Sequence, residues 1–195
     1  AIPGRVEAGG QWALSSSKHK HIVFGALLSG PCWLMVDHLV HPIQMSPGDC
    51  FLVTDGSPVR ISSGFATEAA DSRTVDMDDD APSVIRLGTG IETSLIGTRF
   101  VFDEVYGKAL LGLLPPAIYL RSGSDSAESL KAILRRLGAE IEAPRLGSDL
   151  VVNHLAHLAM VQAIRASLAC SAAPSTGWLG GLADHKIGTA LRMMH

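Results

Sequence analysis

The chain has 195 residues, of which 47% are hydrophobic and 18% are charged, and its formal net charge is −3. This composition supports a folded core and argues against a disordered chain. Proteins that bind nucleic acid by themselves usually carry a basic surface for the phosphates, so the negative balance argues against DNA binding by this chain alone.

Cysteine usage and the apolar segments fit a protein of the cytoplasm. Cys32, Cys50 and Cys170 lie far apart without a C-x-x-C pair, which argues against a disulfide framework or a thiolate zinc site. The N-terminal AIPGRVEAGG lacks the apolar core of a signal peptide. The most apolar long stretch, 150–170, contains Asn, His, Gln and Arg, so we expect no membrane span there.

Residues 1–102 contain short apolar runs separated by turn signals such as Ser29-Gly30-Pro31. Many short strands at this spacing indicate a sandwich or barrel. The expected strands are 11–15, 21–28, 32–37, 41–45, 50–54, 58–62, 84–88 and 93–102. We expect the acidic stretch 71–80, DSRTVDMDDD, to be a solvated loop.

The segment SPGDCFLVTDGSPVR, residues 46–60, reads as turn, strand, turn, strand. Many small β-barrels place a metal-binding His just after the second turn of such a segment. Here that position holds Val59. The segment therefore indicates barrel scaffolding, with an apolar side chain where a metal ligand would otherwise stand.

Beyond residue 102 the hydrophobic pattern becomes helical. A stripe from Leu130 to Ile141 recurs at helical spacing, and Asp125 with Glu128 forms an N-terminal capping pattern. The second expected helix, 149–170, has two apolar stripes and can bury one side against the fold and another against a second subunit. A third begins near Asp184 and reaches His195 without a stop signal, so we expect the natural polypeptide to continue.

Four histidines raise the possibility of a metal site. A tight hairpin around Ser29-Gly30 would place His21 opposite His38, with His19 and His41 close by. Imidazoles bind zinc, nickel, copper or iron. The alternative is that His38 and His41 lie on a surface turn, while His21 is half-buried and hydrogen-bonded to the backbone. The sequence contains no G-x-S-x-G, H-E-x-x-H or phosphate-binding glycine loop.

Several segments, in their order and spacing, resemble a known family. They are GGQWAL ending at Leu14, HIVF from His21, LSGPCWL ending at Leu34, PGDCFLV from Pro47, GSP ending at Pro58, GTRFVF ending at Phe102, LLPP ending at Pro116, GWL ending at Leu179 and DHKIGTALRMMH from Asp184 to His195. Together they resemble a cupin-type β-barrel. More narrowly, they resemble the cupin sensor domain at the N-terminus of one branch of AraC-type transcriptional regulators.

The resemblance implies an α+β fold: an antiparallel cupin-like β-barrel or jelly roll over 1–102, then a small C-terminal helical subdomain over 103–195. It implies a non-catalytic, cytoplasmic module in which the barrel binds a small-molecule effector and the helices form a homodimer. DNA would be bound only by helix-turn-helix units after His195. Metal-binding cupins carry an H-x-H, a Glu and a distant His. Here these positions hold Ser17, His19, Val23 and Val59, so we expect no metal and no other cofactor.

Two sets of residues follow as expected sites. The ligand-binding set is His21, Val23, Leu34, Val36, Phe51, Val59 and Arg60, and the dimer-interface set is His154, His157, Val161, Ile164 and Leu168. Arg60 would meet an anionic effector if it points inward. Two other functions remain open: a metal-dependent cupin oxygenase or isomerase using the clustered histidines His19, His21, His38 and His41, and a stand-alone oligomeric binding protein without a DNA partner.

Overall fold

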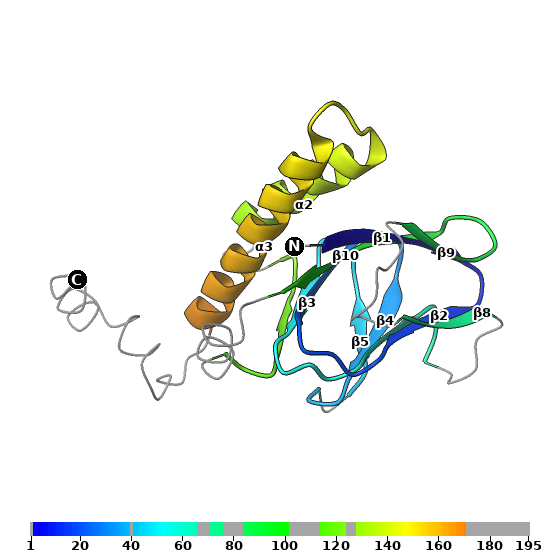
Figure 1. Ribbon diagram of the computed structural model, residues 1–195. Helices are drawn as coiled ribbons and strands as arrows, with labels where there is room; N and C mark the ends of the chain where they lie inside the picture. Colours follow the sequence, from blue (N-terminus) through cyan, green and yellow to red (C-terminus); the bar gives the residue numbers. More distant parts are fainter. Residues whose placement is uncertain are drawn as a thin grey trace, which may run out of the picture.

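The fold consists of two β-sheets packed face to face, with two helices across the outer face of one sheet (Figure 1). It was obtained as a computed structural model, which describes residues 2–39, 41–65, 71–75, 84–101, 114–123 and 128–170. None of the described helices is both long enough and apolar enough to cross a membrane.

The larger sheet has six strands, and the helices lie on it. Their order across the sheet is β11 (Ala117–Leu120), β6 (Cys50–Val53), β3 (Ile22–Ser29), β10 (Thr93–Phe100), β1 (Ile2–Gly9) and β9 (Val84–Gly88). All neighbours are antiparallel except β1 and β9, which are parallel. β11 lies beyond residue 102 yet pairs with β6, and the division of the chain at residue 102 stays a prediction.

The smaller sheet has five strands. Their order is β5 (Ile43–Met45), β4 (Cys32–Val36), β7 (Val59–Ser62), β2 (Trp12–Ser16) and β8 (Asp71–Val75). Here β2 and β8 are parallel. The α+β class is thus confirmed, but of the expected antiparallel barrel or jelly roll, neither a closed barrel nor a purely antiparallel arrangement is found among the described strands. The described strands form an open sandwich of two mixed sheets, because β9 and β8 each add to an edge in parallel.

The expected hairpin around Ser29-Gly30 is also wrong. β3 pairs with β10 and β6, whereas β4 pairs with β5 and β7 in the other sheet. The chain therefore crosses between sheets at Gly30, which has φ 71° and where a Cβ would lie 2.2 Å from the Glu92 carbonyl oxygen. Because β3 and β4 do not pair, His21 and His38 are not cross-strand neighbours.

Part of the expected acidic loop is a strand. Asp71–Val75 forms β8 and pairs in parallel with Trp12–Ser16, while residues 76–80 lie outside the described residues. The Asp71 carboxylate accepts a hydrogen bond from the Gly88 amide at 2.7 Å. A mostly polar composition predicts a loop, but an edge strand needs few apolar side chains, which is why this segment can pair with β2.

Two apolar layers hold the fold together. Between the sheets lie side chains such as Trp12, Leu27 and Leu34, all at most 1% exposed. On the other face of the six-stranded sheet, Phe24 and Phe100 pack against the helices. Strand alternation explains both layers, since successive side chains of β3 point to opposite faces of the sheet.

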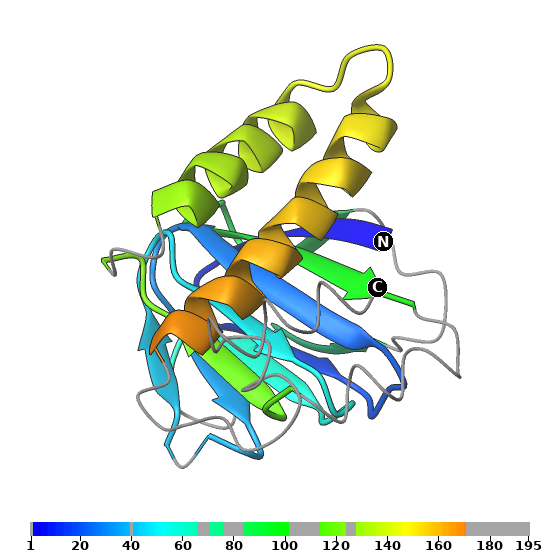
Figure 2. The same ribbon diagram turned by 90° about the vertical axis from the view of Figure 1, so that its left-hand side faces the viewer.

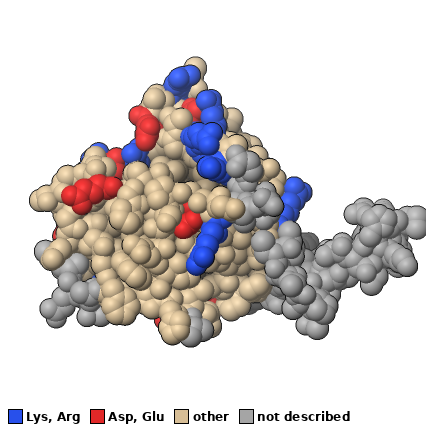
Figure 3. Space-filling model, turned by 180° about the vertical axis from the view of Figure 1, so that it is seen from behind, with Lys and Arg blue, Asp and Glu red and all other residues tan. Residues whose placement is uncertain are grey.

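The helices α2 (Glu128–Glu142) and α3 (Ser148–Cys170) lie antiparallel across the six-stranded sheet (Figure 2). The expected α2 stripe is confirmed, with Leu130, Leu134 and Leu137 buried. Lys and Arg side chains gather over this helical pair on the face shown in Figure 3, while most of the surface beside them is uncharged. The third expected helix, from Asp184, and the cap residue Asp125 lie outside the described residues.

Helix α3 meets the fold through small side chains. Ala156, Ala159, Ala163 and Ala166 are at most 3% exposed and follow helical spacing. Alanines allow the helix backbone to approach the sheet closely. Neither apolar stripe expected from the sequence is this buried face, because both were built on the larger side chains. Val152 and Met160 are buried with the alanines, each 6% exposed, whereas Leu150, Leu158 and Val161 lie on the outer side of the helix.

Candidate functional site

A cavity of about 110 Å³ lies between the two sheets. Its walls come from both sheets, with Val6, Val23 and Leu95 on one side and Leu14 and Ile61 on the other. A single buried water needs only about 10–15 Å³ on a comparable scale, so the space is large enough for a small organic molecule. The lining is mostly apolar, as is typical of small-molecule sites.

A row of three glycines crosses one wall of this cavity. Gly4 on β1 is the register partner of Gly97 on β10, which is the partner of Gly25 on β3. The next position in the row is Phe51 on β6. A Cβ on Gly25 would lie 2.3 Å from ring atoms of Phe51, so the ring occupies that space. A Cβ on Gly97 would find no described neighbour within 4 Å.

Two buried polar side chains also line the cavity. Arg99 is 6% exposed and lies two residues after Gly97, on the same inner face of β10. Ser16 is 7% exposed, and its hydroxyl oxygen accepts a hydrogen bond of 2.9 Å from the Val59 amide. Arg99 therefore contributes a positive charge to a lining that is otherwise mostly apolar.

The structure brings only part of the expected ligand-binding set to the cavity. Val23, Phe51 and Val59 line it, but His21 and Leu34 do not. Leu34 is fully buried in the core, and His21 is half-buried with its carbonyl oxygen 2.9 Å from the His19 Nδ1. The sequence did not single out Gly97 and Arg99. In TSLIGTRF, Leu95, Gly97 and Arg99 alternate and therefore share one face of the strand, and this alternation is the sequence signal that could have identified them.

Val36 and Arg60 belong to a neighbouring hollow of about 350 Å³, which shares Ser15, Ser16 and Val59 with the cavity. Strand alternation puts Arg60 on the face of its sheet opposite Val59. Its Nη1 donates to the Ser15 hydroxyl at 3.3 Å. Arg60 therefore lies beside the rim rather than against the wall between the sheets.

The histidines make separate contacts. His38 Nε2 lies 2.6 Å from the Asp55 carboxylate, and His41 is exposed. Burial raises the pKa of Asp55, but hydrogen bonds from Ser57 and His38, with the charge of His38, outweigh it and hold that pKa below its ordinary value. Within the described ranges, no three His, Cys, Asp or Glu side chains gather in a way that could hold a metal ion.

The buried acid Asp49 anchors the turn before β6. Its carboxylate accepts hydrogen bonds from the Ser46 amide at 2.8 Å, the Tyr119 hydroxyl at 2.6 Å and the Ser122 amide at 2.8 Å. Burial, with the charge of Asp49, raises the pKa values of Cys32 and Cys50 to about 12. These thiols stay protonated at neutral pH, so neither is an activated nucleophile.

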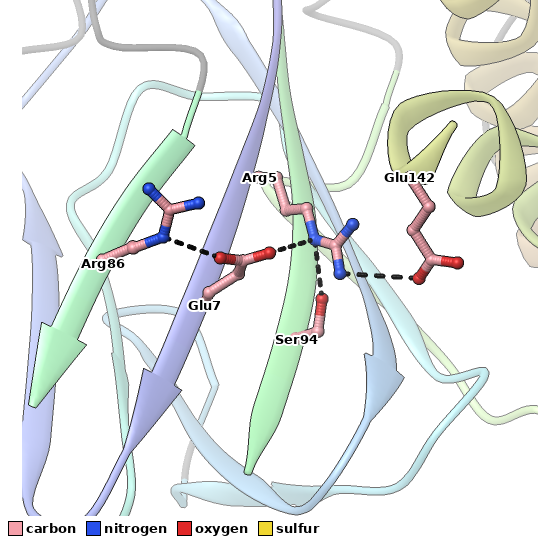
Figure 4. A network of polar contacts seen from close by, with 5 residues as sticks. All are labelled: Arg5, Glu7, Arg86, Ser94 and Glu142. Carbon is pink, nitrogen blue, oxygen red and sulfur yellow. Dashed lines mark hydrogen bonds and ion pairs between the residues drawn. The ribbon is translucent and has the colours of Figure 1, made fainter. Parts of the chain in front are cut away.

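An ion-pair network joins the sheet to α2 (Figure 4). The Glu7 carboxylate on β1 contacts the Nε of Arg5 at 3.2 Å and the Nε of Arg86 at 3.0 Å. Arg5 also contacts the Ser94 hydroxyl at 3.2 Å and Glu142 at the end of α2 at 3.4 Å. Arg5 directly follows Gly4, so β1 connects the glycine row with the helical pair.

The outer side of α3 carries exposed apolar side chains. Leu150 is 64% exposed and Leu158 is 45% exposed. Of the expected interface set, His154 and His157 are exposed and Val161 is 37% exposed. Ile164 is half-buried against the helix–sheet core, and the side chain of Leu168 lies outside the described residues.

Comparison with known proteins adds a family match. Residues 1–169 match the protein family described as Cupin. A putative AraC-like transcription regulator of Streptomyces lividans is 31% identical over 188 residues, which cover 96% of this chain and 62% of that protein. A regulator of the same description from Streptomyces antibioticus matches equally, with 31% identity and the same coverage. The chain thus spans about 62% of the length of these relatives.

Among solved structures, the crystal structure of the AraC-like transcriptional activator CuxR is similar, with 16% identity and a TM-score of 0.38. The match covers 80% of this chain and 44% of that one. A score of this size supports no inference about function.

Proposed function

Since this chain belongs to the cupin family, as a cupin-type sensor domain of the AraC type, we propose that it binds a small-molecule effector between its two sheets. The observation that carries this proposal is the apolar cavity of about 110 Å³, walled by strands of both sheets. An effector bound there would contact strands of both sheets, and β1 would connect the bound effector to α2 through the Arg5–Glu142 contact.

We assign no catalysis to this cavity. None of the described residues that line it is a His, Cys, Asp or Glu, so the lining supplies no ordinary general base and no activated nucleophile. Binding without reaction suits a sensor, whose output is a shift between conformations. It also agrees with the relatives, which are named as regulators.

The second part of the proposal is homodimerisation through the outer face of α3. Leu150, Leu158 and Val161 are exposed there, and His154 and His157 lie beside them. A contiguous exposed apolar face of this kind typically marks an interaction surface. A second copy of the chain is the simplest occupant, because an isologous contact needs only one self-complementary patch.

DNA binding belongs, in this proposal, to the full-length cytoplasmic regulator rather than to residues 1–195. The net charge of −3 is unfavourable for phosphate contact. The relatives are longer than this chain and provide room for a DNA-binding domain.

A thermal-shift screen with small metabolites tests effector binding, because a ligand that binds only the folded state raises Tm. The variant Val59→Phe, which adds volume to the cavity wall, should abolish the shift produced by any hit. Val84→Phe is the matched control, since Val84 is 37% exposed on an edge strand and does not line the cavity. A hit whose shift persists in Val59→Phe, or a screen without hits, would contradict the proposal.

A further inference from the structure

Building on the proposed effector site, we propose that the cavity selects a flat, mostly apolar molecule with one negatively charged group, and that Gly97 determines this selectivity. The flat part lies on the glycine row, and the charged group lies at the Arg99 end. The proposal rests on the row's alignment, on the open space at Gly97 and on the charge at one end of the lining.

The glycine row makes a strip of bare backbone on an otherwise filled wall. Glycine weakens a strand interior, so glycines there often mark close approach of another group. Three aligned glycines, Gly4, Gly97 and Gly25, place that approach at one level of the sheet across three adjacent strands. Neighbouring strands lie about 4.8 Å apart, so the strip is wide enough for a ring.

Phe51 shows what this strip accepts. Its ring atoms Cε1 and Cζ stand 2.3 Å from the position that a Cβ on Gly25 would take. The ring can lie there only because Gly25 has no side chain. The adjacent position at Gly97 is open among the described residues. A planar ligand on Gly97 would continue the layer that Phe51 begins and contact its ring, which favours unsaturated groups.

The charges around the strip favour an anion. Arg99 follows Gly97 by two residues on the same face and is 6% exposed. Arg5, the other arginine of the lining, directs its guanidinium to Glu7 and Glu142 outside the cavity (Figure 4). No described residue of the lining is acidic. A carboxylate bound near Arg99 would be attracted by its positive charge.

The main test uses trans-cinnamate, a flat carboxylate, and measures its affinity by isothermal titration calorimetry. Gly97→Val should weaken cinnamate binding at least about tenfold, because its side chain fills the strip. Tm should not fall, since Val is favoured in strands and the space is open. Gly64→Val is the matched control: Gly64 is also open and lies outside the cavity. Gly97→Ala serves as a smaller second variant if Gly97→Val does not fold.

Two analogues separate shape from charge. Cinnamamide keeps the flat frame but replaces the carboxylate with a neutral amide. In 3-cyclohexylpropanoate the carboxylate is kept, but the flat aromatic ring and double bond are replaced by a puckered ring and a saturated chain. Both should bind at least about tenfold more weakly than cinnamate. In Arg99→Met, which keeps an apolar stem of similar length, cinnamate should fall to the affinity of cinnamamide while cinnamamide stays unchanged. A general packing defect would weaken both ligands equally.

Equal binding of cinnamate and either analogue, unchanged cinnamate binding in Gly97→Val, or no binding of cinnamate to the wild type would each overturn this inference. These failures differ from a failure of the proposed function. If cinnamate fails but a metabolite from the screen binds and loses its effect in Val59→Phe, the effector site stands and the ligand class is wrong. If no metabolite binds, the effector site itself is wrong.

Discussion

Replacing Gly25 with Ala tests whether the glycine row is needed for packing. The new Cβ would lie 2.3 Å from Cε1 and Cζ of Phe51 and 3.1 Å from Cε2. Because carbon atoms pack at about 3.5–4.0 Å, the ring must move by more than about 1 Å. The adjoining cavity gives it somewhere to go, so the chain should still fold.

The expected loss of stability follows from two opposing effects. Overpacking a well-filled core typically costs about 1–3 kcal/mol. Replacing glycine by alanine in a strand returns roughly 0.5–1 kcal/mol. We therefore expect Gly25→Ala to lower the free energy of unfolding by about 1–2 kcal/mol, measured by urea denaturation.

Two controls make this result specific. Gly97→Ala, in the same row but with open space around its Cβ, should leave stability unchanged or raise it by roughly 0.5 kcal/mol. Starting from Phe51→Leu, the Gly25→Ala change should cost much less, which a double-mutant cycle reports as a coupling energy. If Gly25→Ala were as stable as the wild type, or equally costly with and without the Phe51 ring, the reasoning would be refuted.

Three further predictions follow from the described contacts. Leu158→Asp, at a side chain 45% exposed, should abolish the proposed dimer in sedimentation while the circular dichroism spectrum stays that of the wild type. Ile164→Asp, at a half-buried side chain, should instead lower the unfolding free energy by about 3 kcal/mol or more. A monomeric wild type would contradict the dimer. The pKa of Asp55 is lower in the folded state, so the stability that Asp55 contributes is complete above its ordinary pKa of about 4 and is lost as pH falls through the folded value. Below about pH 5, the unfolding free energy of Asp55→Asn should therefore fall less steeply with decreasing pH than that of the wild type. Equal slopes for the two proteins would contradict this. With pKa values of about 12, Cys32 and Cys50 should not react with a thiol reagent at neutral pH until the chain unfolds. Counting the cysteine thiols that react before and after urea is added checks this. Two or more fast-reacting thiols in the folded chain would contradict it.

Local sequence signals predicted most of the strands but not how they pair. β3, β6 and β7 begin and end within about two residues of the expected positions, because glycine and proline turns delimit them. β1 was missed because Pro3 and the glycines in IPGRVEAG are unfavourable in strands. Its place is fixed by pairing with β10 and β9, more than seventy residues away, which no local pattern reveals.

The candidate site was predicted in part for the same reason. Val23, Phe51 and Val59 were expected because apolar residues in alternating strands point to the interior. Gly97 has no side chain to attract attention, and its importance comes from alignment with glycines on two other strands. Such alignment depends on the register of distant segments, and a slip of one residue would remove it.

Strand β1 has a consequence for redesigning this domain. Gly4 and Arg5 are consecutive, so one contributes to the cavity wall and the other contacts α2 through Glu142. Substitutions at inward positions of β1, such as Gly4, would change the cavity wall without removing the outward ion pairs. The shape of the cavity can therefore be changed from the inner face of β1 while the connection to the helices is left intact.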